Sequence, residues 1–115
     1  MPVTIYHNPR CSKSRQALQM LRDKGIEPEI VEYLKTPLDR TGLTALLAEL
    51  GLGPRDLMRR DEATYKELGL GDAKWTDDEL IGFIAEHPIL MERPVVVSDK
   101  GAKVCRPVEV VNTLV

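Results

Sequence analysis

The chain has 115 residues, of which 43% are hydrophobic and 30% are charged, and this composition predicts a single folded domain over residues 1–115. Its formal net charge of −2 argues against a general nucleic-acid binder, so any anion site must come from local clusters of Arg and Lys. No apolar run reaches the length of a membrane span, and the first residues lack a signal-peptide pattern. We therefore expect a cytoplasmic protein without a membrane partner, and a monomer, since no long apolar surface stripe is present.

The first third of the chain predicts a strand, a helix and a second strand. Residues 3–6 are β-branched and aromatic, as in a short strand, and the Asn-Pro step in residues 7–10 interrupts it. A helix should begin just after Cys11 and stop at Gly25, and residues 29–33 alternate like another strand. This order predicts a βαβ unit with two parallel strands.

The middle of the chain is predicted to be helical, with four segments bounded by capping or breaking residues. They run from a cap at Asp39 to Gly51, from Pro54 to Met58, from a cap at Asp61 to Gly69, and from a capping box at Thr76 to Pro88.

The last third returns to strand. Residues 94–97 and 103–105 should form a hairpin about a turn at residues 99–101, and Pro107 should open a terminal helix. The whole pattern predicts an α/β fold with a mixed four-stranded sheet, ordered βαβ and then ββα, with a helical insertion between the two halves.

The segment around Cys11 carries the clearest chemical signal. Cys11 lies where a strand ends and a helix begins, and there free backbone N–H groups and the helix dipole stabilise a thiolate and bind anions. The neighbouring side chains that add positive charge or hydroxyl donors are His7 (when protonated), Arg10, Ser12, Lys13, Ser14 and Arg15. We therefore predict a lowered pKa for the Cys11 thiol.

The second cysteine and the remaining arginines are harder to place from sequence. Cys105 is expected beside Arg106 on the last strand, facing the other way, which favours a structural thiol; a resolving thiol stays the alternative. The two cysteines are too far apart for a zinc motif, so no metal is expected. A guanidinium group is planar and has several N–H donors that suit a tetrahedral oxyanion, and such groups are present at Arg59, Arg93 and Arg106. Their spacing in the sequence alone does not bring these three residues together. Arg60 follows Arg59 directly, and its role is left open.

The segment His-Asn-Pro-Arg-Cys-Ser-Lys-Ser-Arg at residues 7–15 resembles the active-site segment of the ArsC arsenate reductase family, the glutaredoxin-linked class with a thioredoxin-like fold. The resemblance continues in order along the chain, and Arg10, Ser12 and Lys13 bring it closest to the YfgD-like branch of that family. Its further segments are Leu-Met-Arg-Arg at 57–60, Tyr-Lys-Glu-Leu-Gly-Leu at 65–70, His-Pro-Ile-Leu at 87–90, Glu-Arg-Pro-Val-Val-Val at 92–97, and Cys-Arg-Pro at 105–107 with Glu109.

The resemblance implies a role for each matched residue. Cys11 matches the nucleophile, and Pro94 matches a proline that is usually cis and faces it. His7 and Ser14 match positions that tune the nucleophile, to which we add Arg15 from its position. Arg59, Arg93 and Arg106 match the oxyanion-binding arginines.

The implied reaction is the reduction of arsenate to arsenite. The Cys11 thiolate forms a thiol–arsenate adduct, glutathione attacks it, and glutaredoxin completes the reduction. Arsenate, glutathione and glutaredoxin are therefore the expected partners. Glutathione acts as a co-substrate and no bound cofactor is needed, because external thiols supply the electrons.

Three other functions compete with this prediction. A Spx-like regulator that binds RNA polymerase usually carries Cys-x-x-Cys, whereas Ser14 occupies the fourth position here. A glutaredoxin-type thiol transferase would use the same thiolate on a mixed disulfide, with less need for the arginines. A cysteine phosphatase would need Cys-x5-Arg, whereas position 17 is Ala17.

Overall fold

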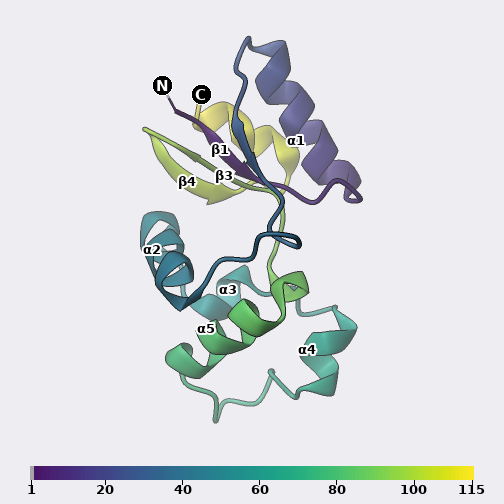
Figure 1. Cartoon of the computed structure of the whole chain (residues 1–115), viewed down its shortest axis with the longest axis vertical. Coiled ribbons are helices and arrows are strands. Elements are labelled where there is room, and N and C mark those ends of the chain that lie inside the picture. The colour runs from purple at the N-terminus through teal and green to yellow at the C-terminus, as the bar shows by residue number, and fades with distance from the viewer. Residues whose placement is uncertain (1) are drawn as a thin grey trace. The chain divides into compact units, whose positions relative to one another are not determined.

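The computed structural model describes residues 2–115, and the chain forms two compact units (Figure 1). The first unit combines the residues up to Thr36 with Arg93–Val115, and the second comprises Pro37–Glu92. The second unit is the helical insertion expected from the sequence. The assignment of residues 1–115 to a single domain stays a prediction.

The first unit is built on a four-stranded sheet in the order β2-β1-β3-β4. Its strands are β1 (Thr4–Tyr6), β2 (Glu29–Val31), β3 (Val95–Ser98) and β4 (Gly101–Val104). β1 pairs parallel with β2 and antiparallel with β3, and β3 pairs antiparallel with β4, so the predicted mixed sheet is confirmed. Helix α1 (Ser12–Asp23) connects the two parallel strands, and the 3₁₀ helix η2 (Val108–Thr113) follows β4.

One face of this sheet carries the core of the first unit. Ile5 of β1 and Val96 of β3 are partners in the pairing register, and both are fully buried. Ala17 and Leu21 of α1 and Val111 of η2 pack into the same apolar cluster. Because Ala17 and Leu21 lie on one side of the helix, their burial fixes the axis of α1 relative to β1. The start of α1 is thereby held at the end of β1.

Several element boundaries differ from the sequence expectation. β2 ends at Val31 rather than at residue 33, because the carbonyl of Glu32 accepts the N–H groups of Lys35 and Thr36 in a turn. The hairpin turn is tighter than expected: Ser98 pairs with Gly101, which has a φ of 125° that only glycine tolerates easily. β4 therefore starts and ends earlier than predicted.

The terminal helix is a 3₁₀ helix rather than an α-helix. Three of its six residues are valines and one is threonine, and β-branched residues lose rotamer freedom in an α-helix. Val108 and Val111, three residues apart, lie on its buried side. The three-residue repeat of a 3₁₀ helix places such a pair on one face.

The second unit contains α2 (Arg40–Leu50), α3 (Pro54–Leu57), α4 (Ala63–Glu67), α5 (Asp77–Glu86) and the 3₁₀ helix η1 (Pro88–Leu90). Asp39 caps α2 as predicted, since its side chain accepts the N–H of Gly42 at 2.8 Å. The predicted capping box of Thr76 and Glu79 starts α5.

The cap predicted at Asp61 is wrong. Helix α4 begins one residue later, and Glu62 occupies its N-cap position with an extended backbone. The Glu62 side chain does not cap the helix, and its carboxylate lies 3.5 Å from Nη2 of Arg59. The Glu62 carboxylate is thus directed toward a neighbouring cation rather than toward the start of α4.

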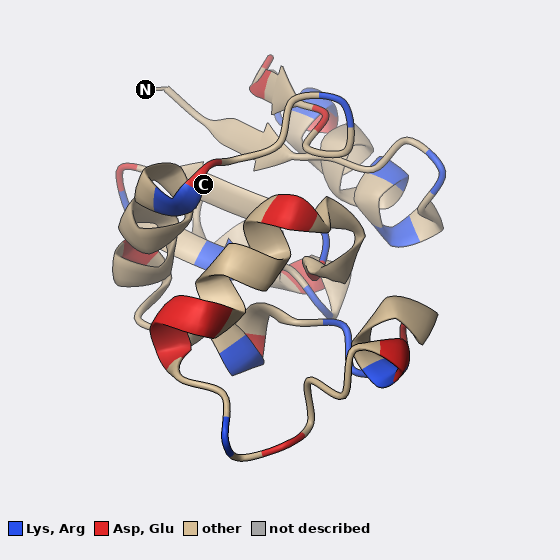
Figure 2. Cartoon of the chain, turned by 60° about the horizontal axis from the view of Figure 1, so that its bottom comes forward, with Lys and Arg blue, Asp and Glu red and all other residues tan. Residues whose placement is uncertain are grey.

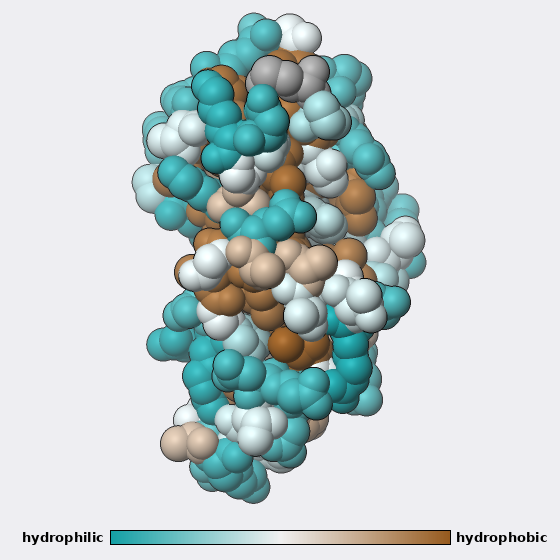
Figure 3. Space-filling view, turned by 90° about the vertical axis from the view of Figure 1, so that its left-hand side faces the viewer, coloured by the Kyte–Doolittle hydropathy of each residue, from teal (hydrophilic) through white to brown (hydrophobic). Residues whose placement is uncertain are grey.

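Residues of both charges are distributed along the chain, as expected for a net charge of −2 (Figure 2). Hydrophilic residues are spread over the face drawn in Figure 3. Large hydrophobic side chains that are exposed include Ile30, Leu34 and Ile89. Among residues 2–115, no helix combines the length and apolar character that a membrane span requires.

Replacing Leu21 with alanine should test the packing that holds α1. Leu21 is fully buried, so Leu21→Ala should lower the free energy of unfolding by about 3 kcal/mol through lost burial and a residual cavity. Urea unfolding followed by circular dichroism measures this loss. Leu34→Ala is the matched control, because Leu34 is 39% exposed and its replacement should stay within about 0.5 kcal/mol of the wild type. Equal losses in the two variants would contradict the assigned core.

Candidate active site

Cys11 is the residue at which the loop after β1 becomes helix α1. It occupies the N-cap of α1 with an extended backbone, φ −92° and ψ 122°, and its carbonyl accepts the N–H of Arg15 at 3.0 Å. The loop before it is tightly turned: the Cys11 N–H donates to the Asn8 carbonyl at 3.0 Å, and Asn8 Oδ1 accepts the N–H of Arg10 at 3.0 Å. Cys11 is partly buried and its thiol is free.

The surroundings of Cys11 favour its thiolate. Burial is the largest single influence and raises the pKa of the thiol, but several interactions together outweigh it and leave the pKa lowered. The backbone N–H of Ser14, the positive charge of Arg93, the backbone N–H of Lys13 and a hydrogen bond from the Arg93 side chain act in this direction. The lowered pKa of the Cys11 thiol that the sequence predicts is therefore supported. Its causes are free N–H groups at the start of a helix and one arginine.

His7 and Ser14 form a buried pair that joins the residue after β1 to the first turn of α1. Nδ1 of His7 lies 2.6 Å from Oγ of Ser14, and the Asn8 N–H donates to the same oxygen at 3.1 Å. Burial is the main reason why the pKa of His7 is lowered. A neutral His7 therefore fits this site, with Nδ1 accepting a hydrogen bond from the Ser14 hydroxyl.

This arrangement differs from the sequence expectation in two respects. The Ser14 hydroxyl interacts with His7 and Asn8, and the group of Ser14 that favours the Cys11 thiolate is its backbone N–H. His7, because its charged form is disfavoured by burial, does not supply the positive charge that was expected near the sulfur.

The cations next to Cys11 in sequence lie on the exposed surface. Arg15 donates from Nη1 to the carbonyl of Pro9 at 2.9 Å, so it holds the loop in place. Arg10 and Lys13 are exposed, and the charged side chain that lowers the pKa of the Cys11 thiol is that of Arg93. The cluster of cations read from the sequence thus contributes less to the thiolate than a residue far along the chain.

Arg93 reaches the site because β3 lies antiparallel beside β1. Val95 pairs with Tyr6, so the residues just before β3 meet the residues just after β1. Nη1 of Arg106 donates to the carbonyl of Arg93 at 3.1 Å, and the Arg93–Pro94 peptide bond is cis, as the resemblance implied. Arg93 is partly buried and Arg106 is exposed. The first unit therefore brings Cys11, His7, Ser14, Arg15, Arg93, Pro94 and Arg106 to one end of its sheet.

Arg59 belongs to the second unit, and its assignment to the oxyanion site rests on the resemblance alone. Its N–H donates to the carbonyl of Leu90 at 2.7 Å, and its guanidinium lies beside Glu62. Nε of Arg59 is buried and has no hydrogen-bond partner among the described residues 2–115. Arg60, next to it, is exposed.

Cys105 lies in the core of the first unit. It is fully buried, and burial raises the pKa of its thiol to about 11. Its sulfur lies 3.6 Å from the carbonyl of Lys103, and its N–H donates to the carbonyl of Pro94 at 2.9 Å. A thiol that is buried and protonated at neutral pH is a poor attacking group, so the structure favours the structural role over the resolving one.

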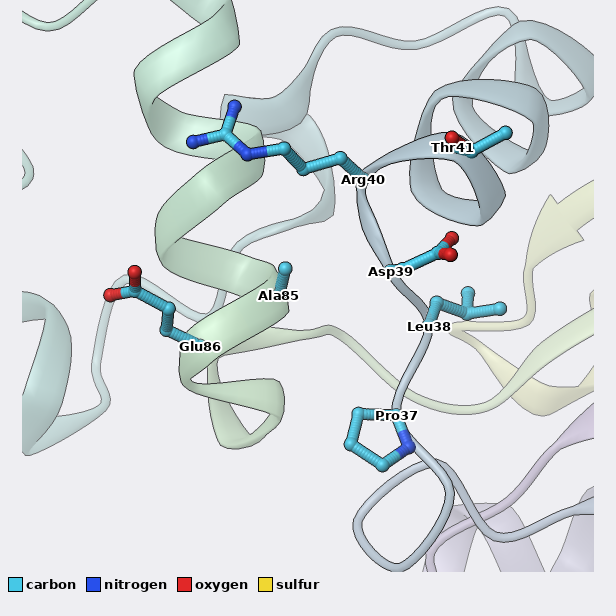
Figure 4. Close-up of a pocket in the computed structure, with 7 residues that line it drawn as sticks. All are labelled: Pro37, Leu38, Asp39, Arg40, Thr41, Ala85 and Glu86. Atoms are coloured by element: carbon cyan, nitrogen blue, oxygen red, sulfur yellow. The ribbon is translucent and has the colours of Figure 1, made fainter.

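Other parts of the described chain offer less chemistry. Residues 2–115 contain no group of three or more His, Cys, Asp and Glu side chains that could hold a metal ion. A hollow in the second unit runs between the segment before α2 and the end of α5 (Figure 4). Its polar side chains do not converge: Asp39 caps α2, and Arg40 donates to the carbonyl of Asp78 at 3.0 Å.

The residues that follow β2 lie beside the site and were not predicted from the sequence to do so. Burial lowers the pKa of His7, and the negative charge of Glu32 partly opposes this shift. Glu32 also lines a pocket with His7, Leu34 and Lys35. The available signal was the predicted parallel pairing, since the carboxyl ends of parallel neighbours meet at the same edge of a sheet.

The chain is similar to known proteins over nearly its whole length. A family model described as the ArsC family matches residues 6–114. An arsenate reductase from Escherichia coli is 51% identical over 109 residues, which cover 95% of this chain and 77% of that protein. A protein of Escherichia coli (strain K12) named Uncharacterized protein YfgD is 49% identical over 114 residues, which cover 98% of this chain and 96% of that one.

A solved structure supports the fold. An arsenate reductase from Vibrio cholerae superimposes with a TM-score of 0.97 at 46% identity, covering 100% of this chain and 98% of that chain. The thioredoxin-like fold expected from the resemblance is therefore confirmed.

The role of Arg93 can be measured on the thiol itself. Removing a cation beside a thiolate destabilises the charged form, so Arg93→Ala should raise the pKa of Cys11. The pH dependence of iodoacetamide alkylation, in a Cys105→Ala background and read by intact mass, reports this pKa. Arg10→Ala is the sequence-adjacent control and should give a smaller shift. A larger shift for Arg10→Ala would show that the local cation cluster controls the thiolate.

Proposed function

The chain belongs to the ArsC family, and on that premise we propose that it reduces arsenate to arsenite with Cys11 as the nucleophile. The observation that carries this proposal is the partly buried Cys11 at the N-cap of α1, where backbone N–H groups and Arg93 lower the pKa of its thiol. A thiolate at this position can attack an electrophilic centre that bears negatively charged oxygens, because the same N–H groups and guanidinium attract those oxygens.

The first step is a condensation. The Cys11 sulfur forms a bond to the arsenic of arsenate, and one arsenate oxygen leaves as water while arsenic stays pentavalent. Arg93 and Arg106 neutralise charge on the remaining oxygens, which is the main electrostatic requirement of this step. The interaction of Arg106 with the Arg93 carbonyl supports a shared site for the two residues.

The electrons come from external thiols. We propose glutathione as the co-substrate and glutaredoxin as the protein that completes the cycle. Overall, one arsenate and two molecules of glutathione give one arsenite, one glutathione disulfide and one water, so no bound cofactor takes part. The burial of Cys105 supports the use of external thiols, because the described chain then lacks a second accessible thiol that could attack the adduct on Cys11.

Three supporting residues act on the geometry of the nucleophile. The His7–Ser14 pair holds the first turn of α1 against the loop after β1, and Arg15 holds that loop through the Pro9 carbonyl. We infer that their part is positioning. Arg59 is proposed as a third oxyanion ligand because it matches an oxyanion-binding arginine of the family. The cytoplasmic location and the monomeric state stay predictions.

The reaction itself should be tested first. Arsenate-dependent NADPH oxidation, coupled through glutathione reductase, glutathione and glutaredoxin, should proceed with the wild type. Cys11→Ser should abolish it, because a hydroxyl does not ionise near neutral pH, and circular dichroism should show an unchanged fold. Turnover retained by Cys11→Ser would remove the nucleophile assignment.

A matched assay distinguishes the main competing activity. A glutaredoxin-type thiol transferase would reduce a glutathione mixed disulfide without arsenate. Arsenate turnover that requires glutathione, glutaredoxin and Cys11 supports the reductase. Mixed-disulfide reduction without arsenate turnover would replace the reductase by the transferase.

We expect replacement of the three proposed oxyanion-binding arginines to lower kcat/KM for arsenate to different extents. Arg93→Ala and Arg59→Ala should each lower kcat/KM for arsenate, because each removes a partly buried cation. The decrease should correspond to a loss of about 2–5 kcal/mol in transition-state stabilisation. Arg106→Ala should lose less, since Arg106 is exposed and its charge is screened. Steady-state kinetics with varied arsenate measure these losses.

Arg22→Ala is the control for removal of an arginine. Arg22 lies in the last turn of α1, is exposed and pairs with Glu27 at 3.1 Å. Its replacement should leave kcat/KM for arsenate unchanged. Wild-type kinetics in Arg59→Ala would remove Arg59 from the site and leave Arg93 and Arg106 as its arginines.

A further inference from the structure

The end of β1 has two flanks in the first unit. On one side lies β3, and Arg93, two residues before its start, acts on the Cys11 thiolate. On the other side lies β2, which runs parallel to β1, so the residues after β2 lie beside the loop that leads to Cys11. The hydrogen bond from the His7 N–H to the Val31 carbonyl at 2.8 Å extends this pairing to the start of the loop.

A pocket lies on the β2 flank. It has a volume of about 190 Å³, and the residues that form it come from positions 7–10 and from Glu32, Leu34 and Lys35. We call it the β2-side pocket. Its surface is mainly apolar, and Pro9 and Leu34 contribute to it. Leu34 is 39% exposed, so its side chain is available for contact with a ligand.

The charged residues of the pocket have both signs. Arg10 and Lys35 are exposed cations, and Glu32 is a carboxylate that lies 3.5 Å from Nζ of Lys35. Glu32 neutralises one of the two cations and His7 is buried and neutral, so the pocket keeps a net positive charge. A ligand with more carboxylates than ammonium groups and a short apolar chain matches this combination.

We propose that the β2-side pocket binds the carboxylate-bearing part of the peptide thiol, glutathione, that attacks the arsenic adduct on Cys11. This inference rests on the proposed function and names the site of its co-substrate. Glutathione carries two carboxylates and one ammonium near neutral pH, so its net charge is opposite to that of the pocket. Arg10 and Lys35 receive a carboxylate, Glu32 faces the ammonium, and the apolar wall contacts the methylene groups.

The pocket lies within reach of the reaction. Adjacent Cα atoms are about 3.8 Å apart, so Pro9 lies within about 7.6 Å of Cys11 along the chain, while an extended tripeptide spans about 10 Å. A glutathione held by its carboxylate in the pocket can therefore place its thiol at Cys11. It also approaches from the flank opposite to Arg93, which leaves the proposed oxyanion side unobstructed.

The step that this binding serves is a second condensation. The glutathione sulfur bonds to the arsenic of the Cys11 adduct, an As–OH group leaves as water, and arsenic stays pentavalent. The bound thiol supplies the proton for the leaving water. Reduction to the trivalent state follows when a further thiol takes one of these sulfurs into a disulfide.

The test measures binding without turnover. S-methylglutathione keeps the carboxylates and the ammonium but cannot react, and its binding to the full chain can be followed by NMR titration. Backbone amide signals of His7, Asn8, Arg10 and residues 32–35 should shift in the wild type. The double variant Arg10→Glu/Lys35→Glu should bind at least about tenfold more weakly, because two charge-assisted contacts become repulsive.

The control is Lys24→Glu, which changes an exposed cation just beyond the end of α1 in the same unit. It should bind S-methylglutathione like the wild type. If the double variant does not fold, Arg10→Ala/Lys35→Ala replaces it, with an expected loss of about threefold or more. Wild-type affinity in the charge variants, or shifts confined to residues outside the pocket, would overturn the proposal, as would absence of binding to the wild type.

Kinetics separate this inference from the proposed function. In the coupled assay the double variant should raise KM for glutathione by about tenfold and leave KM for arsenate unchanged. Arsenate turnover by the double variant with an unchanged KM for glutathione would contradict glutathione binding in the β2-side pocket, and the proposed reductase activity would stand. Binding of S-methylglutathione that depends on Arg10 and Lys35, without arsenate turnover, would keep the pocket and overturn the reductase.

Discussion

The packing of α1 on the sheet is the constraint on which the site of this chain depends. Ala17 and Leu21 are buried with Ile5 and Val96, so the helix has one position relative to β1. That position directs the free N–H groups of its first turn at Cys11. These N–H groups stabilise a thiolate without having to reorient first, as water molecules would. A helix that is anchored by its apolar face holds them in fixed places.

The Cys11 thiolate reflects a balance between burial and compensating interactions. Burial by itself raises the pKa of this thiol, and it also strengthens each favourable interaction because water screens it less. The backbone N–H groups come from the start of α1, and the cation comes from Arg93 before β3. The same balance, without a nearby cation of comparable effect, leaves Cys105 protonated in the core. The same unit thus holds one cysteine whose thiol pKa is lowered and one whose thiol pKa is raised.

The sheet order gives the site two different sides. β1 lies between β2 and β3, so the loop that carries Cys11 meets the residues after β2 on one flank and those before β3 on the other. Arg93 and Arg106 gather on the β3 flank, and Arg10, Glu32 and Lys35 gather on the β2 flank. A nucleophile between two such flanks can be approached by an oxyanion and by a charged peptide thiol without competition for the same groups.

The sequence by itself determined the order of elements, the caps at Asp39 and Thr76, and the position of Cys11 at the start of α1, because these depend on short-range patterns. The tertiary structure decided which cation acts on that thiolate, since the β1–β3 pairing brings Arg93 to it while Arg10 and Lys13 stay exposed. It also decided that burial lowers the pKa of His7 and that Cys105 lies in the core. Burial depends on what packs around a side chain, and residues distant in the sequence supply that packing.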